Sequence, residues 1–217
     1  MSLLTVRGAC CVALLLAFSG LPGLAVAEYL GLLNGRSADP ASYGSFSVEA
    51  GVVAGSLGTV DYQHFGVRVN SRVSDKVVVY GDLGNSQFGA SDGTPFGLGI
   101  FVHLPNQRIN ERLDMALKAS YHASGFTVSG RSLNVTATSF ELLVSGLAEE
   151  GVGGYASIGA HRLNIEFGGA DGTTEYGFGA GLSVPIGAGE AYAGFDFIDE
   201  VTLGVGFRYF LKPVEQP

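Results

Sequence analysis

Charged side chains are scarce in this chain of 217 residues, at 15% of the sequence against about 25% in an ordinary soluble domain. The mean hydropathy is accordingly positive, at +0.31. After the first 27 residues, however, no apolar run approaches the ~18 uninterrupted residues that a transmembrane helix needs. A composition typical of membrane proteins, without a run of helix length, excludes a helical bundle and favours a barrel of strands.

Basic residues and cysteines are also few. The 12 Lys and Arg residues are outnumbered by 20 Asp and Glu residues, which gives a net charge of -8. No basic patch is available to meet phosphates, so nucleic acid is not an expected partner. The two cysteines, Cys10 and Cys11, both lie in the first 27 residues.

Residues 1–27 have the pattern of a secretory signal peptide. Arg7 supplies the positive start, residues 10–18 form a short apolar core, and Ala25 to Ala27 form a small-residue cleavage site before Glu28. Cleavage there would remove both cysteines. We therefore expect an exported chain without disulfides or thiol chemistry.

Glycine and strand-like alternation dominate the rest of the sequence. There are 34 glycines, and from Ser45 onward apolar residues recur with period two, the period of strands. The segments are about 9–12 residues long, as a tilted strand needs to cross a bilayer. We expect an all-β, antiparallel up-and-down barrel of about ten strands over residues 44–211, near 44–54, 58–70, 76–85, 95–104, 112–123, 133–146, 151–162, 174–186, 190–198 and 200–211.

Two of these segments change parity, near His64 in the second and near Ser139 in the sixth. A β-bulge would have this effect, and so would a wrong assignment of the apolar face. Eight strands, with segments merged, is the alternative to ten. Connections near 86–94, 124–132 and 163–173 are longer than the others, and in bacterial barrels the longer loops face the exterior.

The two ends of the chain lack the alternation. We expect residues 28–43 to be a short, poorly ordered periplasmic segment and residues 212–217 to be a periplasmic tail. The barrel itself would then occupy everything between them.

The two faces of the strands indicate which one meets lipid. The polar face consists mostly of Gly, Ser, Thr and Ala, which suits the narrow lumen of a barrel of eight to ten strands. A lysine on the lipid face near mid-strand would cost ~2–4 kcal/mol, so Lys118 is assigned to the lumen. We expect a structural network of charges there, formed by Glu49, Arg68, Asp114, Lys118, Glu141, Asp196 and Arg208. Glu49 and Arg208 would approach each other where the first strand closes on the last.

The last predicted strand carries the most specific motif, Thr202-Leu203-Gly204-Val205-Gly206-Phe207-Arg208-Tyr209. It is similar to the signal read by the outer-membrane barrel-assembly machinery, with Thr202, Gly204, Phe207 and Tyr209 at the defining positions. With the leader and the Gly-rich strands, the chain resembles the small OmpA/OmpX/opacity-type outer-membrane barrels. That resemblance implies insertion into outer-membrane lipid, with the assembly machinery as partner. Members of this group serve as anchors, adhesins, small-solute pores or enzymes.

His122 and Ser124 are the one pair that hints at catalysis, because i and i+2 on a strand share a face. The pair resembles the His-x-Ser of outer-membrane lipid A deacylases, although about five strands follow it here and no third, carboxylate partner is identifiable. We expect no catalytic, cofactor or metal site. His64, His103 and His161 are scattered without ligand spacing.

The function we expect is that of a non-enzymatic, monomeric outer-membrane barrel with a largely plugged lumen and a structural or surface-interaction role. The external partner is unknown. The alternatives are a narrow small-solute pore, a soluble secreted β-barrel that binds an apolar ligand, and, last, a lipid-modifying enzyme of the outer membrane.

Overall fold

The computed structural model describes residues 30–32, 37–57, 60–104, 113–128, 131–147, 151–166, 170–198 and 200–211. The expected signal peptide at 1–27 and the tail at 212–217 lie outside these residues. Within the described chain, no helix is long and apolar enough to cross a membrane.

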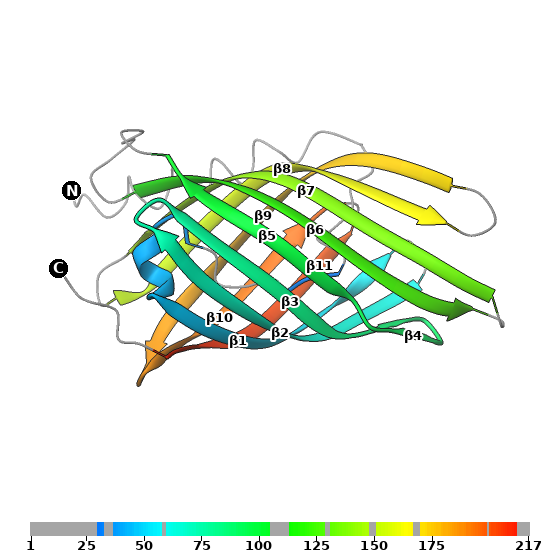
Figure 1. Ribbon diagram of the computed structural model, residues 1–217, viewed down its shortest axis with the longest axis horizontal. Coiled ribbons are helices and arrows are strands. Elements are labelled where there is room, and N and C mark those ends of the chain that lie inside the picture. The colour runs from blue at the N-terminus through cyan, green and yellow to red at the C-terminus, as the bar shows by residue number, and fades with distance from the viewer. Residues whose placement is uncertain are drawn as a thin grey trace, which may run out of the picture.

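The chain forms eleven strands, preceded by the short 3-10 helix η1 (Pro40–Tyr43) (Figure 1). The strands are β1 (Phe46–Leu57), β2 (Val60–Ser74), β3 (Val77–Phe88), β4 (Ser91–Gly93), β5 (Phe96–His103), β6 (Leu113–Val128), β7 (Arg131–Leu147), β8 (Gly153–Glu166), β9 (Ala170–Ile186), β10 (Gly189–Phe197) and β11 (Val201–Phe210).

Ten of these strands close into an antiparallel, up-and-down barrel. Each pairs with its neighbours in the sequence, β3 pairs with β5, and β11 pairs with β1 to close the circle. The three-residue β4 is an additional strand between the ends of β3 and β6. The expected fold and the count of ten are thus confirmed.

The period-two alternation separates two surfaces. On β11, Leu203 and Val205 are exposed on the barrel exterior, whereas Thr202, Gly204 and Arg208 are buried in the lumen. Because side chains alternate across a strand, each strand contributes to both surfaces. The lumen therefore takes the place of a globular core.

Glycines on the lumen face make room for large rings on the next strand. A Cβ at Gly99 would lie 2.1 Å from Cζ of Tyr80, and one at Gly97 would lie 2.0 Å from Cδ2 of His122. These strand glycines are required by the close approach of a neighbouring side chain. They explain how a narrow barrel can hold tyrosine and histidine side chains inside it.

The two parity changes in the sequence are not bulges. In β2, Tyr62, His64 and Arg68 all face the lumen, and Phe65 faces outward. The register shift of β2 lies instead between Arg72 and Ser74. The parity changes come from a wrong assignment of the apolar face. The lumen face itself becomes apolar toward one end of the barrel.

We call the end where β11 finishes the proximal end and the opposite one the distal end. At the distal end β6, β7, β8 and β9 extend beyond the other strands (Figure 1, right). The longer loops expected near 124–132 and 163–173 are therefore wrong in part, because β6–β7 pairing continues to Val128 and Arg131 and β8–β9 pairing to Glu166 and Ala170.

The expectation of a poorly ordered periplasmic segment at 28–43 is also wrong for its described residues. Leu30 and Leu32 are buried inside the distal part of the lumen, and Tyr43 is fully buried. Residues 37–43 lie inside the proximal part, where Ser37 and Ala38 contact Ser145 near the end of β7. This segment contains apolar side chains, and burial in the lumen removes them from water.

Candidate functional site: the filled lumen

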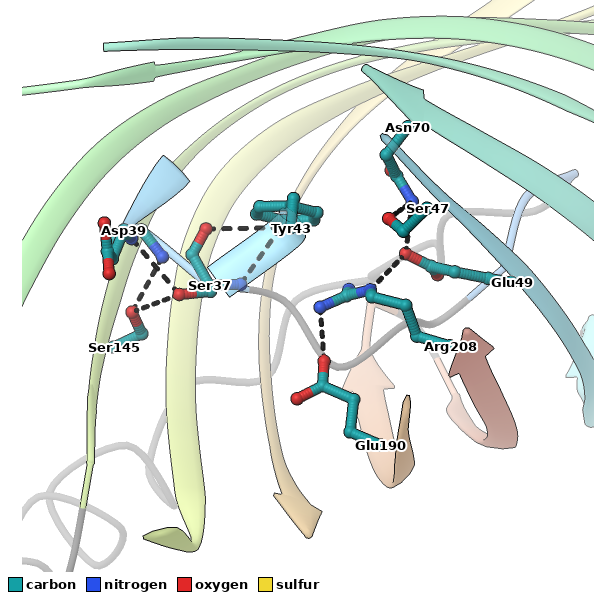
Figure 2. Close-up of polar contacts among 10 residues, drawn as sticks. Ser37, Asp39, Tyr43, Ser47, Glu49, Asn70, Ser145, Glu190 and Arg208 are labelled. Atoms are coloured by element: carbon teal, nitrogen blue, oxygen red, sulfur yellow. Dashed lines mark hydrogen bonds and ion pairs between the residues drawn. The ribbon is translucent and has the colours of Figure 1, made fainter. Parts of the chain in front are cut away.

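Arg208 is the centre of a charge cluster at the closing seam. Its Nε donates to Oε1 of Glu49 at 2.7 Å, and Nη1 donates to Glu190 (Figure 2). Asn70 donates to the same Glu49 oxygen at 2.6 Å. Glu49 and Glu190 lie directly opposite Arg208 on the strands to either side, so the strand register sets this cluster.

Tyr43 of η1 packs against the cluster. The guanidinium carbon of Arg208 lies 4.3 Å from the centre of the Tyr43 ring, a cation–π contact. The Tyr43 hydroxyl donates to the Ser37 carbonyl and accepts from the Ser37 N–H (Figure 2). Burial raises the pKa of the Tyr43 phenol to about 12, so it is neutral at physiological pH.

A second cluster lies nearer the distal end, around Arg68. Its guanidinium is paired with Asp82, which lies directly opposite on β3, and stacks over the Tyr80 ring at 4.1 Å. Arg68 donates to both Asp82 oxygens, and Oδ2 of Asp82 is also 2.7 Å from Nε2 of His122. Arg68, Asp82 and His122 therefore form one buried triad of charged and polar groups.

Lys118 and Glu141 form the third cluster, with Nζ and Oε1 2.8 Å apart. Asp114 and Asp196, the other two residues of the expected network, lie outside these three clusters. Asp114 pairs with His103 at a half-exposed site near the proximal end. Asp196 is buried beside Gly179 and Ser157. The structure therefore divides the expected network into clusters.

The sequence prediction missed several members of these clusters, namely Asn70, Asp82, Glu190 and Tyr43, whose ring packs against Arg208. The signal that could have found Asp82 and Glu190 is cross-strand pairing, because oppositely charged residues directly across an antiparallel pair stabilise it. That signal requires the register, which a one-residue slip would invert.

The distal part of the lumen is apolar. Wall residues pack there with Leu30 and Leu32 of the N-terminal segment, and we call these wall residues the distal cluster: Val53, Tyr62, Phe88, Phe126, Leu133, Val135, Leu163 and Ile198. Leu30 is 2% exposed and Leu32 is 1% exposed. The N-terminal segment thus supplies the centre of a small hydrophobic core inside the barrel.

His122 and Ser124 lie on the lumen face, as expected from their spacing, and the carboxylate absent from the sequence prediction is Asp82. Nε2 of His122 is bonded to that carboxylate, and Ser124 Oγ has no hydrogen-bond partner among the described residues. Gly31 lies against the His122 ring, since a Cβ at Gly31 would lie 2.7 Å from Nε2. No described contact makes His122 the base for Ser124.

The main ion pair of each cluster is closed to water. Both side chains of the Arg208–Glu49, Arg68–Asp82 and Lys118–Glu141 pairs are at most 2% exposed. No group of three or more His, Cys, Asp or Glu side chains suited to a metal ion occurs in the described part of the chain. The lumen is chemically a set of buried ion pairs, with apolar side chains packed beside them and at the distal end.

The residues of the expected assembly motif occupy both faces of β11. Thr202 and Gly204 are buried in the lumen, whereas Phe207 and Tyr209 are exposed on the exterior. Tyr209 lies near the proximal end of the strand. Recognition of these residues by an assembly factor stays a prediction.

The exterior is apolar around the barrel. Exposed side chains on it include Val52, Phe65, Leu83, Leu98, Phe140, Ile158, Leu182, Leu203 and Val205. An apolar surface of this extent is unfavourable in water, and a closed barrel satisfies its backbone groups without water. The fold and this surface define an integral, membrane-spanning β-barrel of the outer-membrane type.

Similarity to known proteins is found among solved structures, at low sequence identity. No family model matches the chain, and no curated protein matches it. Solved structures similar to it include the KdgM porin (9% identity, TM-score 0.38, 76% of this chain and 99% of that one). Others are the N-terminal barrel of Pseudomonas aeruginosa OprF (16%, 0.35, 75% and 97%) and the β domain of the Bordetella autotransporter BrkA (12%, 0.42, 76% and 99%).

Proposed function

We propose that the protein is a monomeric, non-enzymatic anchor of the outer membrane, of the small OmpA/OmpX/opacity type, that does not conduct solutes at rest. The observation that carries the proposal is the filled lumen. The two largest fully buried side chains, Arg68 and Arg208, lie in the interior and are paired there with Asp82 and Glu49. An open aqueous pore would leave such charges in contact with water.

The second support is the distal extension of β6–β9. Exposed polar side chains cover it, and we call them the distal platform: Thr127, Ser132, Asn134, Arg162, Glu166, Thr173 and Thr174. The stretch of β9 from Ala170 to Gly177 has no partner in β10, whose last residue, Phe197, lies opposite Phe178. A protruding polar sheet suits contact with external partners, and we assign the distal end to the exterior.

Conductance of the purified, refolded chain in planar lipid bilayers tests the closed lumen. We expect no steady single-channel steps for the wild type or for the lipid-facing Phe65→Ala control. The Arg68→Ala/Arg208→Ala double variant removes the two largest lumen side chains and should conduct. Steady steps in the wild type would contradict the proposal and support the narrow pore.

The surface role is tested on cells. An Arg162→Ala/Glu166→Ala/Thr174→Ala variant should reach the membrane normally yet change cell–cell aggregation or attachment. Unchanged behaviour would argue against the distal platform as a contact surface.

The absence of catalysis has its own test. If the mass spectrum of lipid A differs between cells that overproduce the wild type and cells that overproduce Ser124→Ala, the non-enzymatic assignment is wrong. We expect identical spectra, because His122 is bonded to Asp82 and lies against Gly31.

A further inference from the structure

The interior of this barrel mixes polar and apolar groups at its proximal and middle levels. Charged groups and serines there, such as Glu49 and Ser145, lie beside a buried apolar cluster that includes Tyr43, Phe101 and Leu143. The distal level is lined by the apolar side chains of the distal cluster, contributed by β1, β2, β3, β6, β7 and β8 and by Ile198 after β10. Burial of polar groups alone would not require this apolar level.

The occupant of the distal cluster is a pair of aliphatic side chains. Leu30 packs against Phe126 and Ile198, and Leu32 packs against Val53 and Tyr62. Both belong to the segment that precedes the barrel, not to its wall. The wall therefore forms an apolar binding surface, and part of the chain itself shows which chemistry fits it.

The fixed end of this segment is the proximal one. Ala38 N donates to Ser145 Oγ at 2.7 Å, and the Tyr43 hydroxyl is held by Ser37. Leu30 and Leu32 are held by non-directional apolar packing. An apolar molecule of similar cross-section gains the same burial, so it competes with the two leucines directly.

A polar atom lies beside the apolar surface. Ser124 Oγ is buried and has no hydrogen-bond partner among the described residues, and Phe126 follows it on the same face of β6. A Cβ at Gly93 would lie 2.6 Å from the Phe126 ring and 2.8 Å from Ser124 Oγ, so the hydroxyl and the ring share one site. This arrangement suits an aliphatic chain with one polar end.

We propose that the distal cluster is a binding site for an aliphatic chain of the fatty-acid class, and that Leu30 and Leu32 occupy it as an internal competitor. The ligand enters from the distal end and displaces the two leucines. The charge clusters around Arg68 and Arg208 below it stay in place, so binding does not require an open pore.

Tryptophan fluorescence tests the site, because the chain contains no tryptophan. Phe126→Trp places a reporter in the distal cluster. Tyr121→Trp is the matched control on the same strand, since Tyr121 faces outward and is 46% exposed. Both are made in the full chain and reconstituted into vesicles. Heat-modifiable migration on gels verifies folding, and Phe88→Trp replaces Phe126→Trp if the latter does not fold.

Two quenchers distinguish a bound free fatty acid from the acyl chains of the bilayer. A brominated phosphatidylcholine stays in the bilayer and should quench Tyr121→Trp but not Phe126→Trp. Free 9,10-dibromostearate should quench both. Quenching of Phe126→Trp by the brominated phospholipid as strongly as by the fatty acid would show that bilayer acyl chains reach the reporter without a specific site, which overturns the proposal.

The internal competitor is tested by Leu30→Ser/Leu32→Ser in the Phe126→Trp background. An apparent affinity is lowered by the fraction of molecules in which the site is unavailable. If the leucines fill the site nine-tenths of the time, half-quenching by dibromostearate should need about ten-fold less fatty acid in the serine variant. An unchanged half-quenching concentration, or no quenching of the lumen reporter in either background, overturns the proposal.

Discussion

Arg208 pairs with two carboxylates, those of Glu49 and Glu190. Substitution of Arg208 therefore removes two ion pairs at the closing seam, whereas substitution of Glu49 removes one. Loss of the arginine leaves Glu49 and Glu190 buried together, whereas loss of Glu49 leaves Arg208 with Glu190. Removing one partner of a buried ion pair costs about 3–5 kcal/mol, because the other charge is left uncompensated.

We therefore expect Arg208→Ala to lower the free energy of unfolding of the detergent-solubilised barrel by about 3–5 kcal/mol. Glu49→Ala should cost less, and the double variant should cost less than the sum of the two. Urea unfolding followed by gel mobility measures all three. Asp114→Ala, at a half-exposed pair, is the control and should cost about 0–1 kcal/mol. Additive losses would mean that the two charges are energetically independent.

Gly99 and Gly81 provide a matched test of lumen packing. They lie on the paired strands β5 and β3, where Gly99 is opposite Tyr80 and Gly81 is opposite Leu98. A Cβ at Gly99 would lie 2.1 Å from the Tyr80 ring, whereas the nearest atom to a Cβ at Gly81 is 3.6 Å away. Gly99→Ala should destabilise the barrel by about 1–3 kcal/mol, measured by the same unfolding assay.

Gly81→Ala should be neutral or stabilise the barrel by about 0.4–1 kcal/mol, because it only restricts the unfolded chain. If the two variants change the free energy of unfolding equally, Gly99 is not needed to make room for the Tyr80 ring.

At this scale the sequence predicted which face each charge occupies and that Glu49 and Arg208 meet at the closing seam, but it did not predict the other pairs. Parity along β1 and β11 was enough to assign Glu49 and Arg208 to the lumen. Asp82 also lies on the lumen face, but its pairing with Arg68 depends on the register of β2 and β3. Register is a property of the closed sheet, and no local pattern in either strand contains it.

At the scale of the strand, the parity changes near His64 and Ser139 were the most informative irregularities. In both β2 and β7 the lumen face changes from polar in the middle to apolar at the distal end, with Tyr62 in one and Leu133 and Val135 in the other. If the lumen is assumed to be polar throughout, this change has the same sequence pattern as a one-residue shift between the two faces of the strand. The same two breaks, compared with each other, locate the distal cluster.

β11 is the strand for which the sequence implies a role beyond packing. Tyr209 is 48% exposed near the proximal end of the exterior, so its ring is available to an assembly factor before the barrel closes. We expect Tyr209→Ala to reduce the amount of heat-modifiable barrel in cells several-fold while folding into detergent micelles in vitro stays largely intact. Tyr176→Ala, on the exterior of β9 at 77% exposure, is the control.

Equal assembly of the Tyr209→Ala and Tyr176→Ala variants would place the assembly signal elsewhere, for example at Phe210. A defect of Tyr209→Ala in vitro as well would make the residue a packing residue rather than a signal.

For the whole molecule, the sequence predicted the barrel, its strand count and its apolar exterior. It did not predict the position of the N-terminal segment. Residues 28–43 lack alternation, and a segment without periodicity gives no indication of what it packs against. Its apolar side chains, Leu30 and Leu32 among them, are buried only because the closed barrel surrounds them, which is a consequence of the tertiary fold.

The orientation of the barrel in the membrane gives the last prediction. Leu182 is 60% exposed on the exterior of β9, in its barrel-forming part opposite Ala193 of β10. Asp92 is exposed on the short β4 at the distal end. If lipid covers the exterior and the distal end faces outward, a cysteine at Asp92 should react with a membrane-impermeant maleimide on intact cells, and one at Leu182 should not.

The chain has no cysteine after Cys11, so cleavage after Ala27, as the sequence predicts, would leave a single reporter in each variant. Leu182→Cys should react fully after denaturation, which shows that lipid alone protects it. Reaction of Asp92→Cys only after the outer membrane is permeabilised would place the distal end in the periplasm. Reaction of Leu182→Cys on intact cells would mean that water, not lipid, covers the exterior of β9, and the apolar surface would then need a protein partner.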